Sequence, residues 1–278
     1  ISFCFNFAIY QLIIFFRNLK DKKEPDIIIG SSPQLLIAFC SFLLAKIIRK
    51  PFVFEVRDLW PQVLIDLGGM NENNILIKVL TYIERLLYLG SDCTVVLASG
   101  AQEYVKARGA KKVLWLPNGP DLSKFKVKNY KTSKILFNKD NPFKLIYAGA
   151  HGIANDLNNV IEAASSIQEY PIKFIFIGDG PEKEKLILKA KNLNNIFFRE
   201  PISKDLIPNE LSKADAILIS LKEVNLFQYG ISPNKLYDAY ALARPIISTL
   251  KGSVNKEIEK HNVGLTTDPG DPSSLAKI

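Results

Sequence analysis

Lys235 and Asp238 are a pair of residues whose types and spacing suit ligand binding. They follow a polar, glycine-containing loop and open a stretch, 235–242, whose pattern predicts a helix. Residues three apart share a helix face, so a point charge for a phosphate would lie beside a carboxylate that can accept two ribose hydroxyls. A surface ion pair on an ordinary helix explains the same two residues.

Charged side chains also follow an apolar strand in the segment Glu55-Val-Arg-Asp-Leu-Trp-Pro61. Burying such groups is costly unless they are paired or functional. The carboxyl end of a strand favours a functional role for Arg57 and Asp58. The alternative is an ion pair of Arg57 with Asp58 or Glu55 that shapes the loop.

Two glycine-containing turns follow predicted strands of the second half. In Tyr147-Ala-Gly-Ala-His-Gly152, the small residues Gly149 and Gly152 would let the backbone approach a diphosphate at a helix N-terminus. His151 is either a ligand contact or a filler of the loop. The turn Gly178-Asp-Gly-Pro-Glu182 is read as structural, with proline and glutamate opening a helix.

The elements that must position these residues alternate between short β-branched strands and helices. The strands are expected at 26–30, 51–56, 93–97, 113–116, 143–148, 172–177, 196–199, 216–220 and 246–249. The helices are expected at 33–48, 73–89, 102–108, 156–168, 182–191, 206–213 and 235–242. Near-continuous apolar strands alternating with helices predict parallel sheets covered on both faces, with ligands at the carboxyl ends of the strands.

The rhythm breaks once, in a lysine-rich stretch, which predicts two doubly wound α/β domains joined by a linker. The expected boundaries are 1–122 for the first domain, 123–142 for the linker and 143–278 for the second domain. The chain opens within an apolar run, 1–16, and we expect a fragment that is cut short at both ends. That run and the run 35–48 are shorter than the roughly 20 residues of a membrane-spanning helix.

Composition narrows the classes of function. The net charge of +8 is spread along the 278 residues, whereas a nucleic-acid binder would more often concentrate it in one stripe. Spread positive charge fits a phosphate-bearing ligand or an anionic membrane surface. The three cysteines and two histidines have no metal-ligand spacing, so we expect reduced thiols, a cytosolic protein and no metal.

Five blocks in order along nearly the whole chain resemble the retaining glycosyltransferase family 4 with the GT-B fold. The resemblance is strongest to its bacterial surface-polysaccharide branch, the amino-sugar transferases of O-antigen and capsule assembly. The blocks are Glu55–Pro61, Pro117-Asn-Gly with Asp121, Tyr147–Gly152, Gly178–Glu182 and Ser232–Ile247. The resemblance implies two Rossmann-like domains that face a cleft, each incomplete at its outer end.

The resemblance also implies roles for single residues. Asp238 would bind the nucleotide ribose, and Asp58 with Arg57 would be the catalytic pair nearest the transferred sugar. Arg199 lies in the loop that reads the base. The remaining donor-site residues would surround the diphosphate: Gly149, His151, Gly152, Ser232, Pro233, Asn234 and Lys235.

The function implied is transfer of a hexosyl group, in the EC 2.4 class, from a nucleoside-diphosphate donor. The donor would be a UDP-linked amino sugar and the acceptor a polyprenyl-diphosphate-linked saccharide, with no cofactor and no nucleic acid. The enzyme would be cytoplasmic and peripheral on the inner face of the membrane. The alternatives are a GT-B UDP-sugar epimerase and a non-catalytic sugar-nucleotide-binding subunit.

Overall fold

The computed structural model describes residues 25–125, 137–229 and 231–278. The apolar run 1–16 and the centre of the predicted linker lie outside these ranges. Contacts divide the chain into two compact units. The first unit is Ile1–Pro117 with Val224–Ile231, and the second unit is Asn118–Glu223 with Ser232–Ile278. The domain boundaries predicted above stay a prediction.

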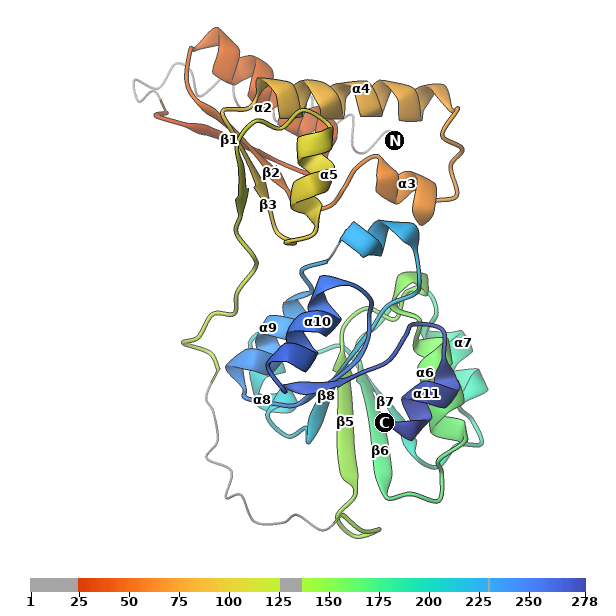
Figure 1. The fold of residues 1–278 in the computed structure, drawn as a ribbon. Coiled ribbons are helices and arrows are strands. Elements are labelled where there is room, and N and C mark those ends of the chain that lie inside the picture. Colours follow the sequence, from red (N-terminus) through yellow and green to blue (C-terminus); the bar gives the residue numbers. More distant parts are fainter. Residues whose placement is uncertain (1–24, 126–136, 230) are drawn as a thin grey trace. The chain divides into compact units, whose positions relative to one another are not determined.

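The first unit is built on a four-stranded parallel sheet in the sequential order β1-β2-β3-β4 (Figure 1). The strands are β1 (Ile28–Ser31), β2 (Phe52–Val56), β3 (Cys93–Val96) and β4 (Val113–Trp115). The helices between them are α2 (Leu35–Ile47), α3 (Gln62–Asp66), α4 (Ile75–Gly90) and α5 (Ala101–Ala107). Right-handed crossovers between sequential strands place these helices on one face of the sheet, where α2 and α4 pack on each other.

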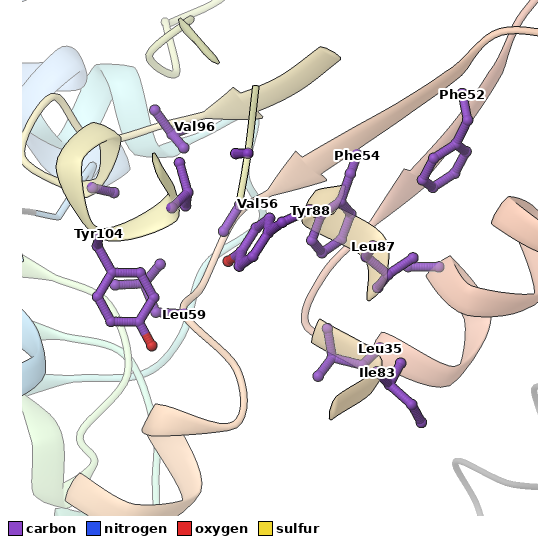
Figure 2. Close-up of a cluster of buried hydrophobic side chains, with 14 of the residues drawn as sticks. Leu35, Phe52, Phe54, Val56, Leu59, Ile83, Leu87, Tyr88, Val96 and Tyr104 are labelled. Atoms are coloured by element: carbon purple, nitrogen blue, oxygen red, sulfur yellow. The ribbon is translucent and has the colours of Figure 1, made fainter. Parts of the chain in front are cut away.

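The core of the first unit lies between this face and the helices (Figure 2). Phe52, Phe54 and Val56 alternate along β2 toward the helices, as the period of two in a strand requires. Tyr88 of α4 packs its ring against Phe54, with centroids 5.4 Å apart. The carboxyl ends of these strands, where Arg57 and Asp58 follow β2, are therefore supported by a well-packed core.

A segment from elsewhere in the sequence completes this core. Residues Val224–Ile231 belong to the first unit although they lie between two elements of the second. They contain the short 3-10 helix η2 (Asn225–Tyr229), which contacts α3. Tyr229 meets Tyr104 of α5 edge to face, with ring centroids 4.8 Å apart.

The second unit has a six-stranded parallel sheet in the order β10-β9-β8-β5-β6-β7. Its strands are β5 (Phe143–Ala148), β6 (Ile172–Ile177), β7 (Ile196–Arg199), β8 (Ala216–Ser220), β9 (Ile246–Thr249) and β10 (Gly264–Thr266). The chain starts in the middle at β5, runs outward to β7, and returns to the other side of β5 at β8. The topological switch point, where a crevice opens at the strands' carboxyl ends, is therefore between β5 and β8.

The helices of the second unit follow its strands (Figure 1). They are α6 (Leu157–Ser165), α7 (Lys183–Lys189), α8 (Ile207–Leu211), α9 (Asn234–Ala241), α10 (Ser253–Lys260) and α11 (Pro272–Lys277), with the 3-10 turn η1 (Ile153–Asn155) before α6. The predicted α/β class with parallel sheets is confirmed, and every predicted strand is present. The sequence patterns did not predict α3, η2, α10, β10 or α11.

Candidate functional site

Lys235 lies at the switch point of the second unit. It is in the first turn of α9, and its Nζ is 4.0 Å from the centroid of the Tyr147 ring at the end of β5. A Cβ added to Gly149 would lie 2.7 Å from the same Nζ, so the lysine in this position packs directly against the glycine. The loops after β5 and β8 thus meet where the topology requires a ligand crevice.

The charge of Lys235 is held with little water around it. Burial lowers the pKa of Lys235 to about 8, and the neighbouring carboxylate of Asp238 acts in the opposite direction. Burial likewise raises the pKa of Asp238, and Lys235 lowers it. A desolvated ammonium beside a half-buried carboxylate can bind an anion and a hydroxyl-bearing group together. The predicted pairing of these two residues on one face of a helix is therefore present.

Glycines let the loops after β5 and β6 come into backbone contact. Gly178 has a φ of +147°, and a Cβ on it would lie 2.0 Å from the carbonyl oxygen of Gly149. The amide of Gly149 donates to the Ile177 carbonyl at 2.9 Å, and the amide of His151 donates to the Asp179 carbonyl at 2.8 Å. These contacts of the turn at 178–182 fix the position of the loop beside Lys235.

The loop before α9 is held by residues that the sequence patterns did not assign to the site. The Asn118 side chain donates from Nδ2 to the carbonyl of Ser232 at 3.2 Å. The hydroxyls of Ser232 and Tyr237 are 2.8 Å apart. Asn118 belongs to the Pro117-Asn-Gly block, and that block is the sequence feature that could have indicated its role in the site. Pro233 is at the N-cap position of α9 and Asn234 is its first residue. The Leu236 amide donates to the Pro233 carbonyl at 3.0 Å, which leaves the amides of Asn234 and Lys235 as the unpaired start of the helix.

His151 is placed inside the protein rather than at a ligand surface. Its side chain is fully buried, with ring centroids 6.1 Å from Tyr147 and 5.9 Å from Phe198. Neither ring nitrogen has a hydrogen-bond partner in the described part of the chain. Burial lowers the pKa of His151, and the charge of Lys183 adds to this effect. Of the two alternatives, the geometry favours the filler of the loop, and Gly152 follows it with its amide 3.4 Å from Asn155 Oδ1.

Arg199, at the end of β7, forms an ion pair with Glu210 of α8 at 3.1 Å. The backbone carbonyl of Arg199 accepts from the amide of Gly178 at 3.3 Å, so the end of β7 is hydrogen-bonded to the loop after β6. Lys183, which is buried, pairs with the exposed Glu200 at 2.9 Å. In the loop after β7, the exposed Glu200 and the backbone are therefore the groups that a ligand could reach.

In the first unit, Arg57 and Asp58 are both exposed at the carboxyl end of β2. The hydroxyl of Ser32 accepts from their two amides, at 2.8 and 3.0 Å, and donates to the Asp58 carbonyl at 3.0 Å. Displacement of water raises the pKa of Asp58, which the charge of Arg57 partly offsets. Glu55 accepts from the hydroxyl of Ser31. Neither alternative ion pair of Arg57 is formed among the described residues, and the Ser32 hydroxyl shapes the loop instead.

The described ranges contain neither a metal-binding cluster nor a helix that could span a membrane. No three histidine, cysteine or acidic side chains gather there in a way that could hold a metal ion. None of the helices described has both the length and the apolar character that crossing a bilayer requires. Cys40 and Cys93 are free and half-buried.

Two units, each a parallel sheet with helices between its strands, define the class of α/β proteins with two Rossmann-like domains. Solved structures place the chain within that class. The structure of Alr3699/HepE from Anabaena in complex with UDP has a TM-score of 0.66 at 16% identity, over 90% of this chain and 67% of that one. The chain has the GT-B fold.

The family signal lies in the second half of the chain. Residues 142–278 match the family model described as Glycosyl transferases group 1. The probable glycosyltransferase WbjE of Pseudomonas aeruginosa is 24% identical over 97% of this chain and 69% of its own length. The putative colanic acid biosynthesis glycosyl transferase WcaI of Escherichia coli K12 is 28% identical over 75% of this chain and 54% of its own length.

Proposed function

We propose that this protein is a retaining glycosyltransferase of bacterial polysaccharide biosynthesis. Its donor is a UDP-linked amino sugar and its acceptor is a polyprenyl-diphosphate-linked saccharide. The observation that carries the proposal is the desolvated Lys235 at the switch point of the segment that matches the group 1 glycosyltransferase model, next to Gly149 and on the same helix as Asp238. The epimerase and the non-catalytic subunit are not favoured, because the family match and both relatives' names describe glycosyltransferases.

UDP is the donor nucleotide that the comparisons support. Alr3699/HepE, which shares the fold, was crystallised with UDP and with UDP and glucose. A diphosphate carries charge that a buried ammonium can bind without a metal ion. WcaI is named for colanic acid biosynthesis, which supports a polysaccharide as the product.

In this proposal the second unit binds the leaving group. Lys235 and the first amides of α9 hold the diphosphate and stabilise the negative charge that grows on it as the glycosidic bond breaks. Asp238, one helical turn further, accepts the ribose hydroxyls. The glycine contacts between the loops hold this arrangement before the ligand arrives, so little reorganisation is needed during the reaction.

The first unit supplies the groups nearest to the transferred sugar. Asp58 and Arg57 are fixed through their amides by Ser32, so the loop that carries them is rigid while their side chains are free to reach a substrate. The pKa of Asp58 is raised, which suits a carboxyl that exchanges a proton with a sugar hydroxyl. Arg57 would steady anionic groups of the substrates.

Contact with the inner face of the membrane is part of the same proposal. Leu114, Trp115 and Leu116, at the end of the first unit's sheet, have between 43 and 54% of their surface exposed. Lys111 and Lys112 precede them in the chain, with Val113 between. Exposed apolar side chains next to cations suit the headgroup region of an anionic bilayer, where a lipid-linked acceptor would be presented.

The test is a calorimetric titration of the purified chain with UDP, GDP and ADP, alongside Asp238→Ala. Asp140→Ala is the matched control, because Asp140 is an exposed aspartate outside the site. Losing a charged hydrogen-bond acceptor is expected to weaken UDP binding by roughly ten- to a hundredfold. Selective UDP binding that falls in Asp238→Ala and not in Asp140→Ala supports the donor site. A folded chain that binds no nucleotide refutes it.

A further inference from the structure

The ammonium of Lys235 lies over the face of an aromatic ring. Its Nζ is 4.0 Å from the centroid of the Tyr147 ring, and Tyr147 is fully buried near the end of β5. Among the residues that the structure describes, no acidic side chain forms an ion pair with Lys235, and Asp238 acts on it from three residues further along α9. The face of an aromatic ring attracts a cation that lies within about 6 Å of the ring centroid. Tyr147 is therefore the side chain that holds this ammonium.

A ring and a carboxylate leave different amounts of charge for a ligand. A carboxylate paired with the ammonium would occupy its N–H donors and would repel an incoming diphosphate. A ring attracts the cation through its quadrupole and carries no net charge, so the donors stay available. An unpaired ammonium with little water around it is costly to hold, and the ring offsets part of that cost. The arrangement therefore suits a lysine that has to meet an anion.

The Tyr147 ring is itself held in place by its surroundings. Its hydroxyl donates to the Ala150 carbonyl at 2.7 Å, and its ring packs edge to face on Phe176 with centroids 6.2 Å apart. A Cβ on Gly149 would lie 3.5 Å from the Tyr147 hydroxyl oxygen and 2.6 Å from Cε of Lys235. Burial raises the pKa of Tyr147, so the phenol stays neutral and does not become a counter-ion for the lysine. Strand β5 and the loop after it thus fix the ring beside the ammonium.

We propose that Tyr147 is a positioning residue of the donor site, whose ring holds the Lys235 ammonium at the switch point without a counter-ion until the diphosphate binds. The inference rests on the proposed function for the identity of the ligand. The contact between ring and ammonium can be tested in the free protein. The competing explanation is that Tyr147 only fills the core, as Phe176 does. Under that explanation the electronic character of the ring does not matter, and its shape alone does.

Three substitutions separate the quadrupole of the ring from its shape. Tyr147→pentafluorophenylalanine keeps an aromatic ring of nearly the same size and reverses the sign of its quadrupole. Tyr147→Phe keeps the quadrupole and loses only the hydrogen bond to Ala150, so it is the conservative variant. Phe174→pentafluorophenylalanine is the matched control, because Phe174 is 3% exposed in the same core and lies toward the amino end of β6, away from the loop after β5.

The first measurement is the pKa of Lys235 in the free chain, followed by NMR of lysine labelled with ¹³C at Cε. The Lys235→Met variant lacks the signal and so assigns it. The parent is expected to titrate near pH 8. Asp238 and His151 are the other titratable groups that interact with Lys235, and every Tyr147 and Phe174 variant keeps both. Fluorination at Tyr147 should lower the midpoint by about one pH unit, and the other two substitutions should leave it unchanged.

The second measurement is the affinity for UDP by calorimetry between pH 7 and pH 8.5. A midpoint lowered from about 8 to about 7 reduces the charged fraction of Lys235 by about twofold at pH 7 and about eightfold at pH 8.5. The loss of UDP affinity in the fluorinated Tyr147 variant should grow with pH in the same way. Tyr147→Phe should bind within about twofold of the parent at every pH, and so should the Phe174 control.

The outcomes distinguish this inference from the proposed function. UDP binding by the parent, with a Lys235 midpoint and an affinity that fluorination leaves unchanged, overturns the role of Tyr147 and leaves the donor site standing. A lowered midpoint in a chain that binds no nucleotide supports the contact of ring and ammonium and counts against the donor site. An affinity loss of the same size at every pH, or one that the Phe174 control shares, overturns the inference in favour of core packing.

Discussion

Replacing Lys235 by methionine is expected to stabilise the free protein while it weakens donor binding. Burial lowers the pKa of Lys235 from 10.5 to about 8, so holding its charge in the folded state costs up to about 3 kcal/mol at pH 7. Methionine keeps the apolar stem that packs against Tyr147 and Gly149 and removes the charge. A gain of this size raises the melting temperature by roughly 2–4 °C per kcal/mol in a chain of this length.

The pH dependence identifies the cause of the gain. The unfolded chain holds the Lys235 proton up to about pH 10.5, and the folded chain up to about pH 8. The unfolded state therefore binds more protons between these values, and the parent chain gains stability as the pH rises through that window. The advantage of Lys235→Met should be full below pH 8 and fade toward pH 10.5. A better-packed core would give an advantage that does not change with pH.

The assay combines thermal unfolding from pH 6.5 to pH 10 with calorimetric titration of UDP at pH 7. Lys256→Met, on the exposed side of α10, is the matched control and should change neither quantity. UDP affinity of Lys235→Met should fall by about ten- to a hundredfold. A variant less stable than its parent at pH 7, or one that binds UDP as tightly, would refute the reasoning.

Three further predictions concern single positions. Gly178→Ala is expected to destabilise the chain by roughly 2–4 kcal/mol and to weaken UDP binding. The reason is that the new Cβ would lie 2.0 Å from the Gly149 carbonyl oxygen at a φ of +147°. Denaturant unfolding measures the loss of stability, with Gly119→Ala as the control because nothing lies within 4 Å of a Cβ there. His151→Phe should stabilise the protein by about 1 kcal/mol and leave UDP affinity unchanged, since two buried unpartnered nitrogens disappear; a loss of UDP binding would show that the imidazole contacts the ligand. Burial raises the pKa of Glu84 to about 7 from 4.5, so the folded state binds more protons between these values and stability should fall by up to about 3 kcal/mol as the pH rises through them. Glu84→Gln should flatten that profile in thermal unfolding.

The strands and the parallel architecture were predictable because their residues are buried on both faces. Runs such as Ile172–Ile177 and Ala216–Ser220 are apolar at nearly every position, and local sequence alone shows this. The five-residue helices α3 and α8 and the three-residue strand β10 are short, so periodicity has little to detect. Of these three short elements, α8 alone was predicted.

The candidate site was predictable in its residue types and less so in its contacts. Lys235 and Asp238 could be paired because they are close in sequence. The contact of Lys235 with Tyr147 and Gly149 depends on which strands are neighbours in the sheet, and no local pattern states that. The burial of His151 could not be predicted for the same reason. Its neighbours in sequence are loop residues, whereas its neighbours in space are the rings of the core.

The excursion of Val224–Ile231 into the first unit affects how the second unit can be produced alone. The segment that matches the family model contains this excursion, and Val224, Phe227 and Tyr229 are half-buried against the other unit's core. A truncated protein that begins near residue 142 would expose these side chains to water and would tend to associate through them. A soluble second unit therefore needs the excursion replaced by a short glycine- and serine-rich connection between Glu223 and Ser232. Removing residues 1–141 alone would leave the core residues Val224, Phe227 and Tyr229 of the first unit attached to the second unit.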